Sequence, residues 1–408
     1  MRRLLPFGLH QLSNVASGVG NGVVLIVIPW LVLDRTGSAA SAGIVAAMAA
    51  LPGIFVSPLI GVVIDRIGRR QVSIGADILS AISVLLFPIF NAVGDLTFGI
   101  ILALAILGAV FDPAGYTARK SLIPDSAKAS HIDINSANGI HEGFFSAGFV
   151  IGPALGAVLI STIGAVHALI AAGVMFGVAA VSIGFLRISD AGQVARTAAA
   201  NRESFVASMM EGLRILRHDR ALFLMTIMVM IVSAAYMPTE TVILPVHFES
   251  LDNAAGLGWT MSALSVGAML SAFSFGWIAK RLTRFRILLA IAFGISIAII
   301  PMSLLPGTLI TVIFAFLLGA SWGPFNPLWN TLVQARIPAE AQGRVYGIQL
   351  SMFIAAVPIG QLITGISIEQ FGLRPTYQGI AVTFVVIAFA IVALPIFRDL
   401  NRDRVSAS

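Results

Sequence analysis

The stretch FDPAGYTARKSLIP, at residues 111–124, recurs without gaps as FNPLWNTLVQARIP at residues 325–338. The Phe, the first Pro, the Thr, the Ile and the last Pro coincide. Two further pairs align in the same order along the chain: GVVIDRIGR (61–69) with GWIAKRLTR (276–284), and GIHEGFFSAGFVIG (139–152) with GIQLSMFIAAVPIG (347–360). A shared order of matching segments predicts two copies of one structural template.

The composition indicates a membrane protein. Of 408 residues, 58% are hydrophobic and only 11% are charged, and the mean hydropathy is +0.95. This is too little charge to cover the surface of a soluble protein. Apolar runs of about twenty residues, each long enough to cross a bilayer as a helix, recur along the chain. We predict twelve transmembrane helices, at 8–33, 42–64, 71–91, 97–118, 138–162, 165–187, 221–247, 257–279, 286–305, 308–333, 345–368 and 375–397.

A polar stretch near the middle divides these helices six and six. The predicted parts are an N-terminal six-helix bundle (1–188), a cytoplasmic linker (189–220), a C-terminal six-helix bundle (221–398) and a cytoplasmic tail (399–408). The linker segment SFVASMMEGLRILR places Phe205, Met209, Leu213 and Leu216 on one helical face. This pattern predicts an amphipathic helix on the cytoplasmic membrane surface. An ordinary linker is the open alternative.

The basic residues set a topology. The net charge is +6, but alternate assignment of the segments puts every Lys and Arg except Arg35 and Arg374 on one side. This positive-inside bias places both termini in the cytoplasm. The basic charge therefore argues against a nucleic-acid partner.

Several kinds of chemistry lack the residues they need. The chain has no cysteine, which excludes disulfides, thiol catalysis and thiolate metal sites. Its six histidines show no metal-ligand spacing, and no phosphate-binding loop is present to use ATP. We expect neither a metal nor a cofactor, and no constellation supports an enzyme.

The segment GVVIDRIGRR, from Gly61 to Arg70, resembles the G-x-x-x-D-R-x-G-R-R loop between helices two and three of the major facilitator superfamily. With the repeat and the helix count, the resemblance extends over the chain and implies a major facilitator fold of twelve transmembrane helices in two six-helix pseudo-repeats. It also implies a conformational latch made by Gly61, Asp65, Arg66, Gly68, Arg69 and Arg70. A purely topogenic loop is the alternative. In the second copy Lys280 stands where the first has Asp65, so a symmetric latch is not expected.

A second motif contains Gly139, Gly148, Gly152, Pro153 and Gly156. It resembles the fifth-helix signature of drug:proton antiporters, with Ala157 in place of the last glycine. Glycines four apart leave a smooth stripe on which another helix can pack closely, and Pro153 can bend the helix there. The resemblance implies a seal and hinge between the halves, and export rather than uptake. Simple close packing predicts the same glycines.

Three carboxylates within the apolar runs are candidates for proton coupling. Glu142 lies beside the glycine stripe, at a depth where a carboxylate is costly unless paired, hydrated or neutral. The alternative is a structural carboxylate paired with a cytoplasmic arginine. Glu240, in YMPTETVILP, could carry a proton, bind a cationic substrate, or remain a hydrated carboxylate near the outer mouth.

The third candidate, Asp112, is followed on the same helical face by Tyr116 and Arg119. The spacing fits a structural Asp–Tyr–Arg chain as well as a proton relay. We expect Asp77, early in the third predicted helix, to be structural.

Aromatic and amide side chains suit an adaptable site for greasy molecules. Asn21 makes the first predicted helix polar on part of its surface, and the tenth presents Trp322, Asn326, Trp329 and Asn330 on one face. Ordinary tryptophan packing is the alternative. The candidates for the substrate cavity are Asn21, Tyr116, Tyr236, Glu240, Trp322, Asn326, Trp329 and Asn330.

The segments WLVLDRTGS (30–38), FDPAGYTARKSLIPD (111–125) and QGRVYG (342–347) resemble the macrolide-efflux and mycobacterial multidrug-efflux (Tap-type) branch of this superfamily. The resemblance implies proton-driven export of amphipathic or cationic compounds across the bacterial cytoplasmic membrane, by a chain that we expect to be a monomer. The alternatives are a dedicated exporter of one metabolite or siderophore, a proton-coupled uptake symporter, and a non-transporting membrane sensor. The first helix lacks the carboxylate, and the fourth the mid-membrane arginine, of some related exporters.

Overall fold

The computed structural model describes residues 4–94, 96–132, 134–186, 205–337 and 339–401. Within its helices, the side chains at 54–62, 65–66, 134–136, 138–139, 142, 146, 205–209, 211–212, 334, 339–344, 346–347, 350 and 354 lie outside the description. The chain divides into two compact units, Met1–Arg202 with Phe248–Gly258, and Glu203–His247 with Trp259–Ser408.

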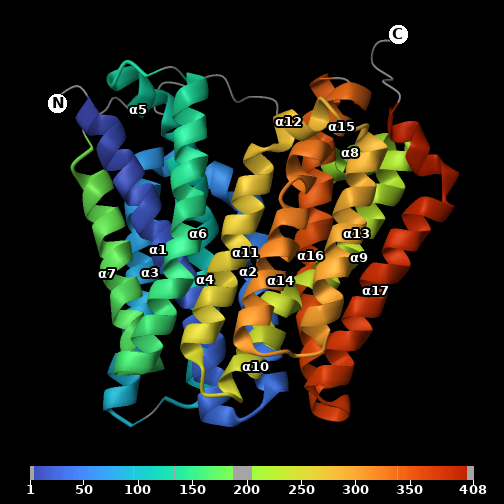
Figure 1. The fold of residues 1–408 in the computed structure, drawn as a ribbon. Helices are drawn as coiled ribbons and strands as arrows, with labels where there is room; N and C mark the ends of the chain where they lie inside the picture. The colour runs from blue at the N-terminus through green and yellow to red at the C-terminus, as the bar shows by residue number, and fades with distance from the viewer. Residues whose placement is uncertain (1–3, 95, 133, 187–204, 338, 402–408) are drawn as a thin grey trace. The chain divides into compact units, whose positions relative to one another are not determined.

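All regular structure in the described residues is helical, which confirms the predicted fold class (Figure 1). In the part of the chain that the structure describes, eleven helices or helix runs are long and apolar enough to cross a membrane. The remaining predicted span, 42–64, falls in the 29-residue helix Ala39–Ile67, whose described apolar part is Ala39–Gly53. The chain is therefore a multi-span membrane protein.

The described residues before the linker form seven helices: α1 (Leu5–Thr36), α2 (Ala39–Ile67), α3 (Arg69–Ala92), α4 (Phe98–Ser121), α5 (Ile123–Ala129), α6 (Ile134–Ile163) and α7 (Ala165–Gly184). α1 packs against α6 and α7, while α3 packs against α4 and α7, and α2 against α4 (Figure 1). Gly37, with φ of 61°, ends α1, and the Ser38 side chain caps α2 by accepting a hydrogen bond from the Ser41 amide.

The remaining helices begin after the linker. They are α8 (Phe205–His218), α9 (Arg220–Pro238), the π-helical turn η3 (Thr239–Ile243), α10 (Leu244–Glu249), α11 (Ala254–Phe273), α12 (Phe275–Ala279), α13 (Arg284–Ser303), α14 (Thr308–Trp322), α15 (Phe325–Arg336), α16 (Ala339–Phe371), α17 (Leu373–Ala393) and the 3₁₀ turn η4 (Pro395–Asn401). α9 packs against α16, α13 packs against α14 and α17, and α8 packs against α16 and α9.

A buried arginine of α15 links the start of α9 and the turn η4 in the second unit. Arg336 donates to both carboxylate oxygens of Asp219, at 2.7 and 3.0 Å, and to Asp399 of η4 at 3.1 Å. Asp219 also caps α9 by accepting from two backbone amides. Burial acts to lower the pKa of Arg336, but the hydrogen bonds to Asp219 and Asp399 outweigh it and hold the pKa above its usual range.

The predicted glycine stripe packs against α1 of its own unit. A Cβ atom at Gly152 would lie 2.6 Å from the Cα of Gly22, and one at Gly148 would lie 2.8 Å from the Cα of Gly18. Facing glycines therefore let the α1 and α6 backbones touch, as small residues do in membrane helix pairs.

Gly152→Ala is expected to destabilise the first unit by about 1–3 kcal/mol, the usual cost of overpacking a filled site. Gly143→Ala on the same helix is the matched control, because nothing lies within 4 Å of a Cβ there. Both can be measured by thermal unfolding in detergent, followed through tryptophan fluorescence. Equal unfolding temperatures for the two variants would contradict this packing.

Candidate functional site

One face of α1 is polar from its start to its middle. His10, Asn14, Ser17 and Asn21 follow one another at intervals of four, three and four residues, so the 3.6-residue period places them in a row. Each finds a partner inside the first unit. The Asn14 amide, for example, donates to the His141 backbone carbonyl of α6 at 2.8 Å. A polar column therefore runs through an otherwise apolar bundle.

Asp112, in the middle of α4, lies at the Asn21 end of this column. The Asn21 side-chain amide donates to one Asp112 carboxylate oxygen at 2.6 Å. Both side chains are half-buried. The amide donor stabilises the carboxylate on one oxygen, and no described residue donates a hydrogen bond to the other. Asp112 can therefore hold a proton on that second oxygen without losing its contact with Asn21.

Two turns along α4, Arg119 forms a buried ion pair with Asp77 of α3. One guanidinium nitrogen donates to both Asp77 oxygens, at 2.7 and 2.8 Å, and another donates to the Ser17 hydroxyl at 2.7 Å. Arg119 and Asp77 are each only 2% exposed. Buried charges of this kind persist only when they are paired and hydrogen-bonded.

Arg119, Asp77 and Asp112 together have a net negative charge when all three are ionised. Arg119 interacts electrostatically with both Asp77 and Asp112, and the two carboxylates interact with each other. One positive and two negative charges leave a net negative charge in a medium of low dielectric constant. Uptake of one proton by a carboxylate makes the cluster neutral, so the arrangement suits a single exchangeable proton.

One expectation about this region is wrong. Tyr116 does not join Asp112 to Arg119: its hydroxyl accepts from Lys120 at 3.4 Å and its ring packs on Phe145. The buried ion pair with Arg119 fits the structural role expected for Asp77. The sequence pattern did not identify Arg119 as its partner, because the two residues lie on different helices.

The end of the column nearest the start of α1 contains two buried histidines. The ring of His10 lies 2.8 Å from the Ser126 hydroxyl and 2.9 Å from the Arg119 carbonyl oxygen. A neutral His10 can satisfy both by donating to the carbonyl and accepting from the hydroxyl. The His141 ring lies beside it, with centroids 5.2 Å apart. The Glu142 side chain and the surroundings of Gly139, both named in the sequence analysis, lie outside the description.

The candidate latch is described only in part. Gly68 has φ of 107°, which a residue with a side chain rarely adopts. The Arg69 side chain donates to the Ser121 carbonyl oxygen at 3.0 Å and pairs with Asp125 at 3.3 Å, and Arg70 donates to the Ile183 carbonyl oxygen at 3.1 Å. These contacts fasten the start of α3 within the first unit. The side chains of Asp65 and Arg66 and the surroundings of Gly61 lie outside the description.

In the second unit, Glu240 lies in the π-helical turn η3 between Pro238 and Pro245. π-turns inside helices are frequent at functional sites. Tyr236 precedes Glu240 by four residues, and the two side chains interact electrostatically although the phenol lies outside hydrogen-bond geometry. Gln361 of α16 donates to the Thr241 hydroxyl at 3.1 Å. The two prolines were the available sequence signal for this irregular turn.

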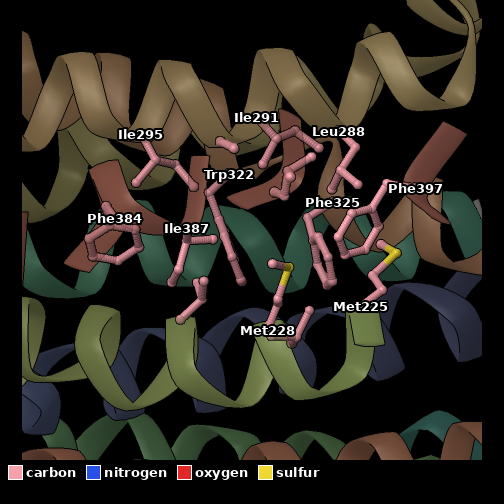
Figure 2. Close-up of a pocket in the computed structure, with 14 residues that line it drawn as sticks. Met225, Met228, Leu288, Ile291, Ile295, Trp322, Phe325, Phe384, Ile387 and Phe397 are labelled. Atoms are coloured by element: carbon pink, nitrogen blue, oxygen red, sulfur yellow. The ribbon is translucent and has the colours of Figure 1, made fainter. Parts of the chain in front are cut away.

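An aromatic stack leads from Tyr236 to a small apolar cavity. The Trp322 ring is stacked with Tyr236, at 5.2 Å between centroids, and with Phe325, at 5.0 Å. Figure 2 shows Trp322 and Phe325 on the cavity together with Met225, Met228 and aliphatic side chains of α13 and α17. The cavity volume is about 40 Å³, which is too small for a drug-sized molecule.

The remaining cavity candidates do not share one environment. Trp322 ends α14, and a break at Gly323 and Pro324 precedes α15. On α15, Trp329 is buried whereas Asn326 and Asn330 are exposed. The expectation that the four side chains form one face is therefore wrong, because the helix is interrupted and α15 turns the tryptophan and the asparagines into different surroundings.

Asp77→Asn is expected to destabilise the first unit by about 3–5 kcal/mol, because it leaves the buried Arg119 without its counter-charge. The double variant with Arg119→Gln should lose less than the sum of the two single changes. Thermal unfolding followed by tryptophan fluorescence measures both.

Asp125→Asn is the matched control, since its partner Arg69 is partly exposed and such pairs contribute about 1 kcal/mol or less. The pairing would be refuted if Asp77→Asn cost no more than this control.

The sequence of the chain is similar to a known family and to individual members of it. The model of the Major Facilitator Superfamily matches residues 12–360. The chain is 31% identical to the multidrug efflux pump Tap of Mycolicibacterium fortuitum, over 97% of both proteins, and 23% identical to macrolide efflux protein A of Streptococcus pyogenes, over 91% of both.

Solved structures show the same fold. The nucleoside transporter NupG superposes with a TM-score of 0.79 at 15% identity, covering 97% of this chain and 99% of NupG. A bacterial homologue of the human lysosomal transporter Spinster gives 0.74 at 14% identity, covering 98% of each. With the matched family model spanning most of its length, the chain belongs to the major facilitator superfamily.

Proposed function

We propose that this chain exports amphipathic or cationic drugs across the bacterial cytoplasmic membrane, in exchange for protons and by alternating access. The relatives support drug efflux, because they are named as a multidrug efflux pump and a macrolide efflux protein. The observation that carries the proton coupling is the cluster of Asp112, Asp77 and a single Arg119, with Asn21 on Asp112.

Asp112 is the proton carrier in this proposal. Asp77 is paired directly with the Arg119 guanidinium, which favours its charged form, whereas Asp112 has a neutral amide as its hydrogen-bond partner. A proton therefore binds Asp112 at lower cost than Asp77. Protonation removes the net negative charge, and deprotonation restores it, so the two states differ in the energy of the first unit. A difference of a few kcal/mol is enough to shift a conformational equilibrium between two faces of the membrane.

Glu240 is the proposed partner of a cationic substrate. Its position in an irregular turn, next to Tyr236 and the Trp322 stack, combines a negative charge with aromatic surface. A cation with an apolar body fits such a pair of features, because aromatic faces also attract cations. Met225 and Met228, which adapt their shape readily, line the cavity at the far end of the stack.

The remaining assignments follow from the same proposal. The proton gradient supplies the energy, so no cofactor is needed, and the charge bias places both termini in the cytoplasm. The chain would work as a monomer within the lipid bilayer. The glycine stripe of α6, packed against α1, would be the joint of the first unit, and the Gly61–Arg70 loop its latch.

Asp112→Asn is expected to abolish proton-driven uptake of ethidium into inverted membrane vesicles while leaving ethidium binding intact, because the amide cannot exchange a proton. Asp34→Asn, which removes an exposed carboxylate at the end of α1, is the control and should transport normally.

Glu240→Gln should weaken binding of cationic compounds more than that of neutral macrolides.

The outcomes separate the parts of the proposal. Full proton-driven transport by Asp112→Asn would overturn its role as proton carrier. A wild-type protein that moves no member of a broad drug panel would overturn polyspecific export and favour a dedicated metabolite or siderophore.

A further inference from the structure

The connection between α11 and α13 lies at a membrane surface. The helices Ala254–Phe273 and Arg284–Ser303 are both long and apolar enough to cross the membrane. The residues between them, including the short helix α12 (Figure 1), must therefore lie where the membrane meets water. Under the orientation proposed above, this is the cytoplasmic surface.

This connection exposes apolar and cationic side chains together. Phe273 is 70% exposed and Trp277 is 59% exposed. Lys280, Arg281 and Arg286 are also exposed, and none of the three forms an ion pair with a described residue. We call the segment Phe273–Arg286 the α11–α13 patch. It combines surface that favours acyl chains with charge that favours anions.

Arg281 is held in a defined position. Its guanidinium lies over the Trp277 ring, 4.0 Å from the centroid. Stacking uses the flat face of the guanidinium and leaves the N–H groups around its edge free to donate. A preoriented fork of donors matches the oxygens of a phosphate group, because it loses less freedom on binding than an unrestrained side chain.

The two copies of the repeat differ at the same place. Lys280, Arg281 and Arg284 align with Asp65, Arg66 and Arg69 of the first copy. Arg69 and Arg284 both turn to the protein: Arg69 donates to the Ser121 carbonyl oxygen, and Arg284 donates to the Leu400 carbonyl oxygen at 3.5 Å. The replacement of an aspartate by Lys280 reverses the charge beside Arg281. The second copy therefore offers a concentrated positive charge where the first has an acidic residue.

We propose that the α11–α13 patch binds the headgroup of an anionic phospholipid. The lipid phosphate accepts hydrogen bonds from Arg281 and Lys280, and the acyl chains cover Phe273 and Trp277. A lipid can contact the cations and the aromatic side chains with one molecule, whereas a soluble anion can contact only the cations, which is why the lipid is the better fit. Tryptophan and basic residues are also the usual anchors at this depth. The inference does not depend on drug export.

The test uses the full-length protein in phosphatidylcholine nanodiscs that contain either brominated phosphatidylglycerol or brominated phosphatidylcholine. Bromine quenches nearby tryptophan fluorescence, and subtraction of the Trp277→Phe signal isolates Trp277. We expect stronger quenching of Trp277 by phosphatidylglycerol at equal mole fraction. The double variant Lys280→Gln/Arg281→Gln should lose this preference, by about fivefold in relative affinity for each cation removed.

The matched control is Arg374→Gln, which removes an exposed arginine at the start of α17 and should leave the preference unchanged. Unchanged unfolding temperatures are expected for all variants, because the altered side chains are exposed. Equal quenching by the two lipids, or a preference that survives in the double variant, would overturn the proposal. Competition by soluble glycerol phosphate as effective as that by the lipid would also overturn it, in favour of a free-anion site.

Discussion

A charge inside an apolar helical bundle must have a partner, and Arg119 imposes this requirement on the whole first unit. Its guanidinium is almost completely buried and draws Asp77 of α3 and Ser17 of α1 toward α4. These contacts fix how three helices pack around one another. Asp112 lies two turns away on the same helix, and Arg119 interacts electrostatically with it. Arg119 would therefore contribute both to the fold and to the proposed proton coupling.

The glycine stripe complements this polar column. Gly18 and Gly22 alternate along α1 with Ser17 and Asn21, so this part of α1 presents polar side chains to α4 and a smooth surface to α6. Direct contact between the α1 and α6 backbones leaves no side chains to interlock. In the proposed mechanism, a change in the charge of Asp112 would reach α1 through the hydrogen bond with Asn21.

The sequence alone predicts the membrane spans, the repeat and the family, because hydropathy and motif spacing are local properties. It also predicts a close helix contact at Gly148 and Gly152, but not the partner, since α1 lies more than a hundred residues away. A structural role for Asp77 could be predicted, but its partner Arg119 could not, since it lies on another helix. The Asp112–Tyr116–Arg119 chain was wrong because the rotamer of Tyr116, rather than its helical face, decides its contacts. The environments of Trp329, Asn326 and Asn330 depend on a break before α15 that the hydrophobic pattern hides.

In the proposed mechanism, Asp112 carries the exchangeable proton of a cluster with one arginine and two carboxylates. Calorimetry of tetraphenylphosphonium binding, repeated in buffers with different enthalpies of ionisation, counts the protons released. We expect the wild type to release about one proton and Asp112→Asn to release none, with binding retained in both. An unchanged proton release by Asp112→Asn would exclude Asp112 as the proton carrier and assign the exchangeable proton to another group.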